Sequence, residues 1–178
     1  MTQRAPHGPA PGQPVEVRRA RIEDAEAVRA IYNREVLEST AVFDLVPRTL
    51  EDQRAWLADR EGAYAVVVAA LPGTGGPIVG FGALSPYRTR PAYATTVEDS
   101  VYVERGHHRR GVGRALLEEL VRLATAHGFH SVIGRVVDAN AASIALHRAC
   151  DFEVVGTERE VGRKFGRWLD VVVLQRLL

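Results

Sequence analysis

One segment just past the middle of the chain limits the fold more than any other. His108–Ala115 reads HRRGVGRA and lies between an apolar run that ends at Val103 and an amphipathic helical pattern that begins at Leu116. Gly111 and Gly113 let the backbone turn tightly and approach a ligand closely. The first N–H groups of the following helix have no partner within the helix, and the helix dipole favours an anion there. The segment therefore predicts an anion-binding turn between a strand and a helix.

Three arginines beside this turn favour a ligand that carries a pyrophosphate. Arg109, Arg110 and Arg114 add cationic side chains that bind phosphate oxygens well. A P-loop is excluded because it needs a lysine after its last glycine, and the single lysine of the chain is Lys164. A dinucleotide-binding fold needs a third glycine where Leu116 stands, and too little chain follows for a doubly wound domain. The alternative is an ordinary glycine-rich turn with solvated arginines.

Length and composition set wider limits. A chain of 178 residues suits one domain with its own core, expected over residues 15–178, after a disordered tail rich in proline and glycine over residues 1–14. The single cysteine, Cys150, excludes an internal disulfide and fits a reducing cytoplasm. No run approaches the ~20 apolar residues of a membrane span. With 23 basic and 22 acidic residues, the chain gives no reason to expect nucleic acid or a membrane surface as a partner.

Hydrophobic periodicity predicts a mixed α/β (α+β) fold with the order βααβββαβαββ. Helices are expected over about 22–39, 50–61, 113–127 and 141–150. Strands are expected over 15–18, 64–69, 78–84, 96–103, 131–136, 152–155 and 168–174. This order implies one mixed sheet with helices on its faces.

Two of these segments resemble signatures of the GNAT-type N-acetyltransferases. That family carries Arg/Gln-x-x-Gly-x-Gly/Ala after its fourth strand, and residues 108–113 fill this slot with histidine in the first position. A second signature, Asn-x-x-Ala/Ser-Ile-x-Leu-Tyr/His followed by Phe, is matched by residues 140–147 and Phe152; Asp151 replaces the usual glycine and tolerates a left-handed turn. The resemblance covers 15–178. It implies a mostly antiparallel central sheet flanked by helices, with acetyl-CoA as co-substrate and no metal.

Within this family the chain is most similar to the phosphinothricin and methionine sulfoximine acetyltransferases. The similarity rests on residues 32–36, 39–43, 88–93, 96–103 and 162–170. It implies direct acetyl transfer to the α-amine of a small amino-acid-like substrate, and a homodimer. Alternatives are another amine, such as a polyamine or a protein N-terminus, or an acyl-CoA-binding sensor without turnover.

The resemblance also implies how acetyl-CoA is held. The backbone of Val101, Tyr102 and Val103 is expected to pair with the pantetheine arm in the manner of an added strand. Asn140 is expected to bind the pantetheine amides, although asparagine equally suits the N-cap of the next helix. The pyrophosphate is expected on the turn, at Arg109, Arg110, Gly111, Val112, Gly113 and Arg114.

Amine acetylation needs a group that removes a proton from the α-ammonium. Glu98 is the first choice of general base, because burial beside the thioester would raise the pKa of its carboxyl. Asp99 is the second choice, because successive residues of a strand point to opposite faces. His147 stands where many relatives carry a tyrosine that protonates the leaving thiolate. It is expected to supply a proton or contact the substrate, or else to be a packed helix residue.

The acceptor is expected to be held by its acidic group. Arg88 and Arg90 precede the strand that carries Glu98, and a pair of guanidinium groups suits a carboxylate or phosphinate. Solvation of an exposed loop is the alternative for both. Lys164, Phe165 and Trp168 lie in the last hairpin, where relatives close the substrate pocket and often meet a second subunit.

Overall fold

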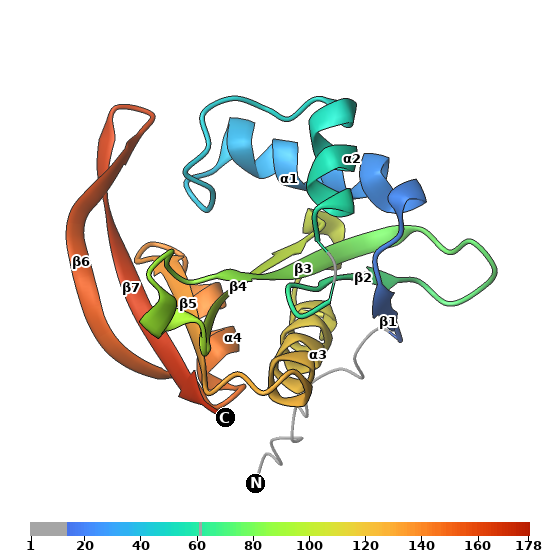
Figure 1. Cartoon of the computed structure of the whole chain (residues 1–178). Helices are drawn as coiled ribbons and strands as arrows, with labels where there is room; N and C mark the ends of the chain where they lie inside the picture. Colours follow the sequence, from blue (N-terminus) through green and yellow to red (C-terminus); the bar gives the residue numbers. More distant parts are fainter. Residues whose placement is uncertain (1–13, 61) are drawn as a thin grey trace, which may run out of the picture.

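A seven-stranded sheet forms the centre of the fold (Figure 1) in a computed structural model that describes residues 14–60 and 62–178. The strand order is β1-β2-β3-β4-β5-β7-β6, and every neighbouring pair is antiparallel except β4 and β5. The strands are β1 (Glu16–Arg19), β2 (Val66–Ala70), β3 (Ile78–Pro86), β4 (Thr96–Val103), β5 (Ser131–Val137), β6 (Glu153–Lys164) and β7 (Arg167–Leu177). The mostly antiparallel mixed sheet and the order βααβββαβαββ are thereby confirmed.

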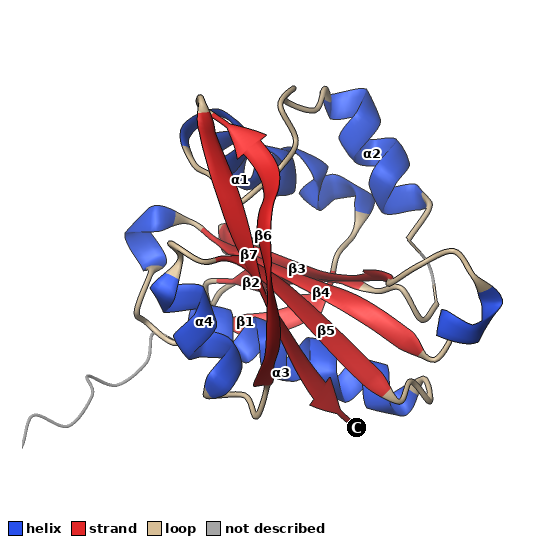
Figure 2. Cartoon of the chain, turned by 90° about the vertical axis from the view of Figure 1, so that its left-hand side faces the viewer, coloured by secondary structure: helices blue, strands red, loops and turns tan. Residues whose placement is uncertain are grey.

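Helices cover both faces of the sheet (Figure 2). They are α1 (Ala25–Glu38), α2 (Leu50–Ala58), α3 (Val112–Ala126) and α4 (Ala141–Arg148), with short 3₁₀ turns at Ile22–Asp24, Pro91–Tyr93 and Arg105–His107. Thr49 caps α2 with Asp52 in a capping box, and Gly128 with φ +78° follows the end of α3. Both caps agree with the helix limits read from the sequence. The tail predicted over residues 1–14 lies outside the described residues apart from Pro14.

The core has two layers because the middle strands are apolar on both faces. Val66 and Val68 of β2 pack on α1 and α2, whereas Val67 and Ala69 pack on α3. Alternate strand residues point to opposite faces, so a continuous apolar run fills both layers. We call these two sides the α1/α2 face and the α3/α4 face.

The last two strands form a longer hairpin than the sequence predicted. β6 continues to Lys164, beyond the predicted limit at residue 155. It lies at the edge of the sheet and most of its residues are exposed, so it lacks the alternation that marks a half-buried strand. Figure 1 shows the hairpin of β6 and β7 rising beside α1.

The parallel pair separates part-way along its length. β4 pairs with β5 only from Thr96 to Asp99, opposite Ser131 to Gly134. Beyond this point β4 continues on β3, and β5 continues on β7. Among the described residues, Ser100–Val103 therefore have no strand partner on the β5 side. We call this opening the fork. Across the described part of the chain, no helix is long and apolar enough to cross a membrane.

Candidate functional site

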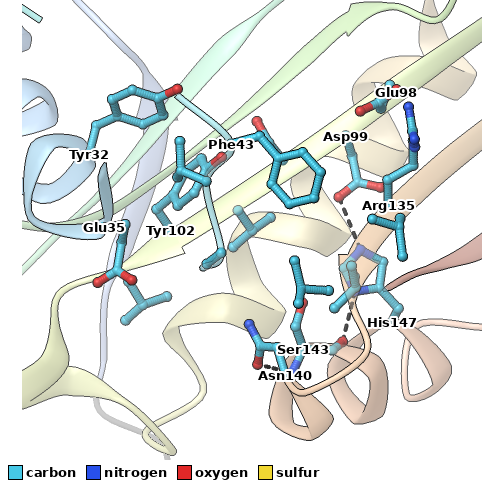
Figure 3. Close-up of a pocket in the computed structure, with 18 of the residues that line it drawn as sticks. Tyr32, Glu35, Phe43, Glu98, Asp99, Tyr102, Arg135, Asn140, Ser143 and His147 are labelled. Atoms are coloured by element: carbon cyan, nitrogen blue, oxygen red, sulfur yellow. Dashed lines mark hydrogen bonds and ion pairs between the residues drawn. The ribbon is translucent and has the colours of Figure 1, made fainter. Parts of the chain in front are cut away.

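A cavity of about 400 Å³ opens at the fork. Its walls come from α1, the loop after α1, β4, β5, α4 and one residue of β7 (Figure 3). The cavity meets both faces of the sheet because the strands separate there. It is therefore reached by side chains that a continuous sheet would keep apart.

The edge of β4 lines one wall through Val101, Tyr102 and Val103. Their side chains pack in the core: the ring of Tyr102 stacks on Phe81 with centroids 4.9 Å apart. The ring of His108 lies with Nε2 2.9 Å from the carbonyl oxygen of Val103, which ties the following turn to the strand. The strand thus offers backbone to the cavity while its side chains hold the fold together.

The turn ends at the N-terminus of α3. Gly111 has φ +84° and no described side chain caps this helix, so its first N–H groups face outward. Arg109 and Arg110 are exposed at the turn. Arg114 also lies at the surface, where its Nε donates to Glu118 at 2.7 Å. An open helix terminus of this kind can bind a phosphate group through its backbone N–H groups.

Glu98 lies at the point of the fork on the α1/α2 face and is partly buried. Burial raises the pKa of its carboxyl, the charge of Arg135 opposes this, and the carboxylates of Asp99 and Glu158 add to it; the net effect is a raised pKa. Arg135 itself forms an ion pair with Glu158 of β6. A carboxyl with a raised pKa in a cavity is a stronger proton acceptor than an exposed carboxyl, which suits a general base.

The side chain of Asp99 points from β4 toward the α3/α4 face, where it contacts His147 of α4. Oδ2 of Asp99 lies 3.2 Å from Nε2 of His147, and the two residues are only 6% and 3% exposed. Burial alone would lower the pKa of His147, but the hydrogen bond and charge of Asp99 and the Ser143 carbonyl outweigh it, so the pKa is raised. The sequence predicted the opposite directions of Glu98 and Asp99 but not this ion pair. Glu98 and His147 therefore approach the cavity from different faces.

Asn140 stands at the start of α4 and lines the cavity. Its side-chain oxygen accepts a hydrogen bond from the backbone N–H of Ser143 at 3.1 Å, so it caps the helix as expected. The cap turns the residue toward the fork. Both uses of this asparagine considered from the sequence are compatible with its position.

Arg88 and Arg90 lie outside the fork cavity. Both are exposed in the segment between β3 and β4, and the guanidinium of Arg88 lies 5.0 Å and 5.6 Å from the ring centres of Tyr87 and Tyr93. The described residues that line the cavity include neither arginine. Their contact with an acceptor stays a prediction.

Three arginines that the sequence analysis did not single out lie close to Glu98. Arg135 lines the fork cavity, and Arg48 and Arg60 line a recess of about 200 Å³ that adjoins it at Glu98. Arg48 lies 3.9 Å from the ring centre of Tyr32, and Arg60 donates to the carbonyl of Leu84. Arg135 could have been found as the one charged residue of an apolar strand. The other two stand in no motif.

The last hairpin holds the loop that covers the cavity. Nζ of Lys164 donates to the carbonyl of Val42 at 2.7 Å and lies 3.4 Å from that of Glu35. Lys164 is 4% exposed, and burial lowers the pKa of its ammonium. Phe165 and Trp168 at the tip remain exposed. The hairpin therefore shapes the cavity through backbone of the loop after α1.

The described residues hold no group of three or more histidine, cysteine or acidic side chains arranged for a metal ion.

Comparisons with known proteins agree with the geometry of the fork. The sequence pattern of the Acetyltransferase (GNAT) family matches residues 26–152. Phosphinothricin N-acetyltransferase from Streptomyces coelicolor is 40% identical over 166 residues, which cover 92% of this chain and 96% of that protein.

Two further relatives are similar over most of their length. L-methionine sulfoximine/L-methionine sulfone acetyltransferase from Pseudomonas aeruginosa is 36% identical over 160 residues, covering 89% of this chain and 92% of that protein. The crystal structure of a phosphinothricin acetyltransferase from Sinorhizobium meliloti in complex with acetyl-CoA matches with a TM-score of 0.86 and 36% identity. It covers 92% of this chain and 88% of that one.

Proposed function

Since this chain belongs to the Acetyltransferase (GNAT) family, we propose that it moves the acetyl group of acetyl-CoA to the α-amine of a small amino-acid-like substrate such as phosphinothricin or methionine sulfoximine. One observation carries the proposal. A carboxyl with a raised pKa, Glu98, stands in a cavity lined by an unpaired strand edge, and that strand leads through a turn to an open helix terminus. Such an arrangement suits an acyl donor with a long polar arm and a phosphate end.

The residues present fit acetyl-CoA. The edge of β4 at Val101–Val103 offers backbone groups to the amides of the pantetheine arm, and Asn140 faces it across the fork. The turn from Arg109 to Arg114 offers N–H groups and guanidinium groups to the pyrophosphate. Acetyl-CoA supplies an activated acyl group, and these residues hold and orient it.

Glu98 prepares the acceptor. Its ionised carboxylate takes a proton from the α-ammonium, directly or through a water, and leaves a neutral amine with a free electron pair. A bond then forms between that nitrogen and the thioester carbonyl carbon, while the bond from carbon to sulfur breaks and sulfur keeps its electron pair. Cys150 is buried away from the fork, so the chain offers no thiol there to carry the acetyl group.

Arg88 and Arg90 are proposed to bind the acidic group of the acceptor. They precede β4 on the side where Glu98 enters the strand, and both are exposed to an incoming ligand. Selection of a phosphinothricin-like acceptor would follow from this charge. Acetylation of phosphinothricin would in turn give resistance to that herbicide.

A homodimer and a cytoplasmic location complete the proposal. The hairpin of β6 and β7 exposes apolar side chains at Val161, Phe165 and Trp168, and a second copy of the chain would cover them. The single buried thiol fits a reducing compartment. Sedimentation equilibrium of the wild type and of Trp168→Glu tests the dimer: the wild type should have twice the mass of the chain, and the variant should shift toward the monomer.

The activity is tested by release of free thiol from acetyl-CoA across a panel of amines. The panel holds phosphinothricin, methionine sulfoximine, methionine sulfone, ordinary amino acids, a polyamine and a peptide with a free N-terminus. Saturable turnover with the sulfoximine or phosphinothricin is the expected result. Turnover with the polyamine or peptide alone would move the acceptor to another amine, and binding of acetyl-CoA with no turnover would leave a sensor.

A further inference from the structure

We propose that Asp99 is a positioning residue that keeps His147 protonated at the fork, so that this pair supplies the proton taken up by the leaving sulfur. The inference rests on the proposed acetyl transfer. It gives the two neighbouring carboxylates of β4 different roles in one reaction. Glu98 takes a proton from the amine, and Asp99 acts through His147 on the proton given to the sulfur.

The two hydrogen-bond partners of the His147 ring show why it holds a proton. Nδ1 lies 2.8 Å from the carbonyl oxygen of Ser143, and Nε2 lies 3.2 Å from Oδ2 of Asp99. A carbonyl oxygen only accepts hydrogen bonds, and so does an ionised carboxylate. A neutral imidazole has one N–H and would leave one of these contacts without a proton. The imidazolium donates in both directions and satisfies both.

The surroundings of the ring reinforce this state. Asp99 is the charged side chain that faces it from β4, and the Ser143 carbonyl faces it from α4. The ring of Phe152 packs edge-on at 5.1 Å, and β5 presents Gly134, which has no side chain. Among the described residues, the carboxylate of Asp99 is the charged group that acts on the ring, and because both side chains are buried its effect is weakly screened.

Gly134 makes room for the pair. A Cβ at this position would lie 2.7 Å from Cδ2 and 2.8 Å from Nε2 of His147, and 3.3 Å from Oδ1 of Asp99. A Cβ at these distances would force the ring or the strand to shift, so glycine in β5 lets the ring lie against the strand. The site is therefore shaped for the ring in this one position.

One oxygen of the pair is left without a partner. Oδ1 of Asp99 is buried and has no hydrogen-bond partner among the described residues. A buried carboxylate oxygen without a donor is costly, and such groups often await a ligand or water. Asp99, Ser143 and His147 all line the fork cavity, so a group entering it reaches the pair.

The proton balance of acetyl transfer needs such a donor. An ammonium loses two protons as it becomes an amide, and the sulfur gains one as it leaves as a thiol. Glu98 takes the first proton on the α1/α2 face. The second proton leaves the nitrogen for solvent once the bond to the acetyl carbon has formed. On the α3/α4 face, the proton held between Nε2 of His147 and Oδ2 of Asp99 passes to sulfur, and the pair regains one from solvent. Because the pKa of His147 is raised, the ring holds its proton until the departing thiolate, whose ordinary pKa is ~8.5, takes it.

The test compares the pH dependence of kcat in the wild type, Asp99→Asn and Asp138→Asn, the last being an exposed carboxyl at the end of β5 that serves as the matched control. Activity falls as pH rises through the pKa of His147, because the proton is lost. The Asp99→Asn change removes the charge that raises this pKa and leaves the burial that lowers it. The basic limb should therefore move to lower pH in Asp99→Asn, with kcat reduced on the order of 10-fold to 100-fold and KM for acetyl-CoA unchanged.

A readout without turnover separates this inference from the proposed function. In protein labelled with ¹⁵N-histidine, the wild type should show both ring nitrogens of His147 protonated at pH 7, and Asp99→Asn should show one. Gly134→Ala should displace the ring, change these signals and lower kcat without removing a titratable group. A neutral His147 in the wild type, or an unmoved pH profile in Asp99→Asn, would overturn the inference. Inactivity of the wild type toward every amine would reject the function alone.

Discussion

The two halves of the proposed acetyl-transfer site are built in different ways. The half proposed to hold acetyl-CoA comes mainly from one stretch, residues 101–114, and uses a strand edge and a helix terminus. The half around Glu98 is assembled from side chains of α1, the loop after it, β4 and β5, and a hairpin residue positions that loop. Backbone groups are present whatever the side chain. Tolerance to substitution should therefore differ between the halves, and three experiments test this from the largest effect to the smallest.

Glu98→Gln should give the largest loss. The amide keeps the shape of the side chain but cannot take a proton, so kcat should fall on the order of 10²–10⁴-fold with little change in KM for acetyl-CoA. In the wild type the carboxyl must be ionised, and its raised pKa means that activity climbs with pH through a value above 4.5. Stopped-flow thiol release from pH 5 to 9 should show this acid limb in the wild type and lose it in the variant. An unchanged profile would remove Glu98 as the base.

Arg88→Ala and Arg90→Ala should act on the acceptor alone. Each removes a charged donor proposed to bind its acidic group, so KM for phosphinothricin should rise about 10-fold, as expected for a contact of ~1.5 kcal/mol. KM for acetyl-CoA should not change. Arg122→Ala is the matched control, since Arg122 is an exposed helix arginine paired with Glu119. Equal KM values in all three variants would place the acceptor elsewhere, with Arg135, Arg48 and Arg60 as the next residues to change.

Gly111→Val tests the backbone half. A β-branched residue at φ +84° is strained by about 1–3 kcal/mol, so the turn should shift and the Kd for acetyl-CoA should rise several-fold, measured by calorimetry. Gly156→Ala is the control, because Gly156 has space for a Cβ and no positive φ. By contrast, Val101→Ile should leave the Kd nearly unchanged. A larger effect from Val101→Ile than from Gly111→Val would contradict the backbone account.

The same difference explains what could be predicted from the sequence. The turn at 108–113 and the strand before it were predictable, because a tight turn, a helix terminus and an apolar strand depend on neighbouring residues. The cap by Asn140 was predictable for the same reason. The pair of Asp99 with His147 was not, since it joins residues 48 positions apart and depends on Gly134 in a third element. The hairpin was predicted too short because an exposed edge strand has no hydrophobic alternation to mark it.

Lys164 is the single lysine of the sequence, and its ammonium is buried against backbone carbonyls. The other members of the 23 lysine and arginine side chains are all arginines, whose guanidinium groups stay protonated and are poor nucleophiles. An acetyl thioester can acetylate exposed amines of the protein that binds it. This chain carries its positive charge without an exposed side-chain amine, so its surface should resist the chemical modification that its own co-substrate could otherwise cause.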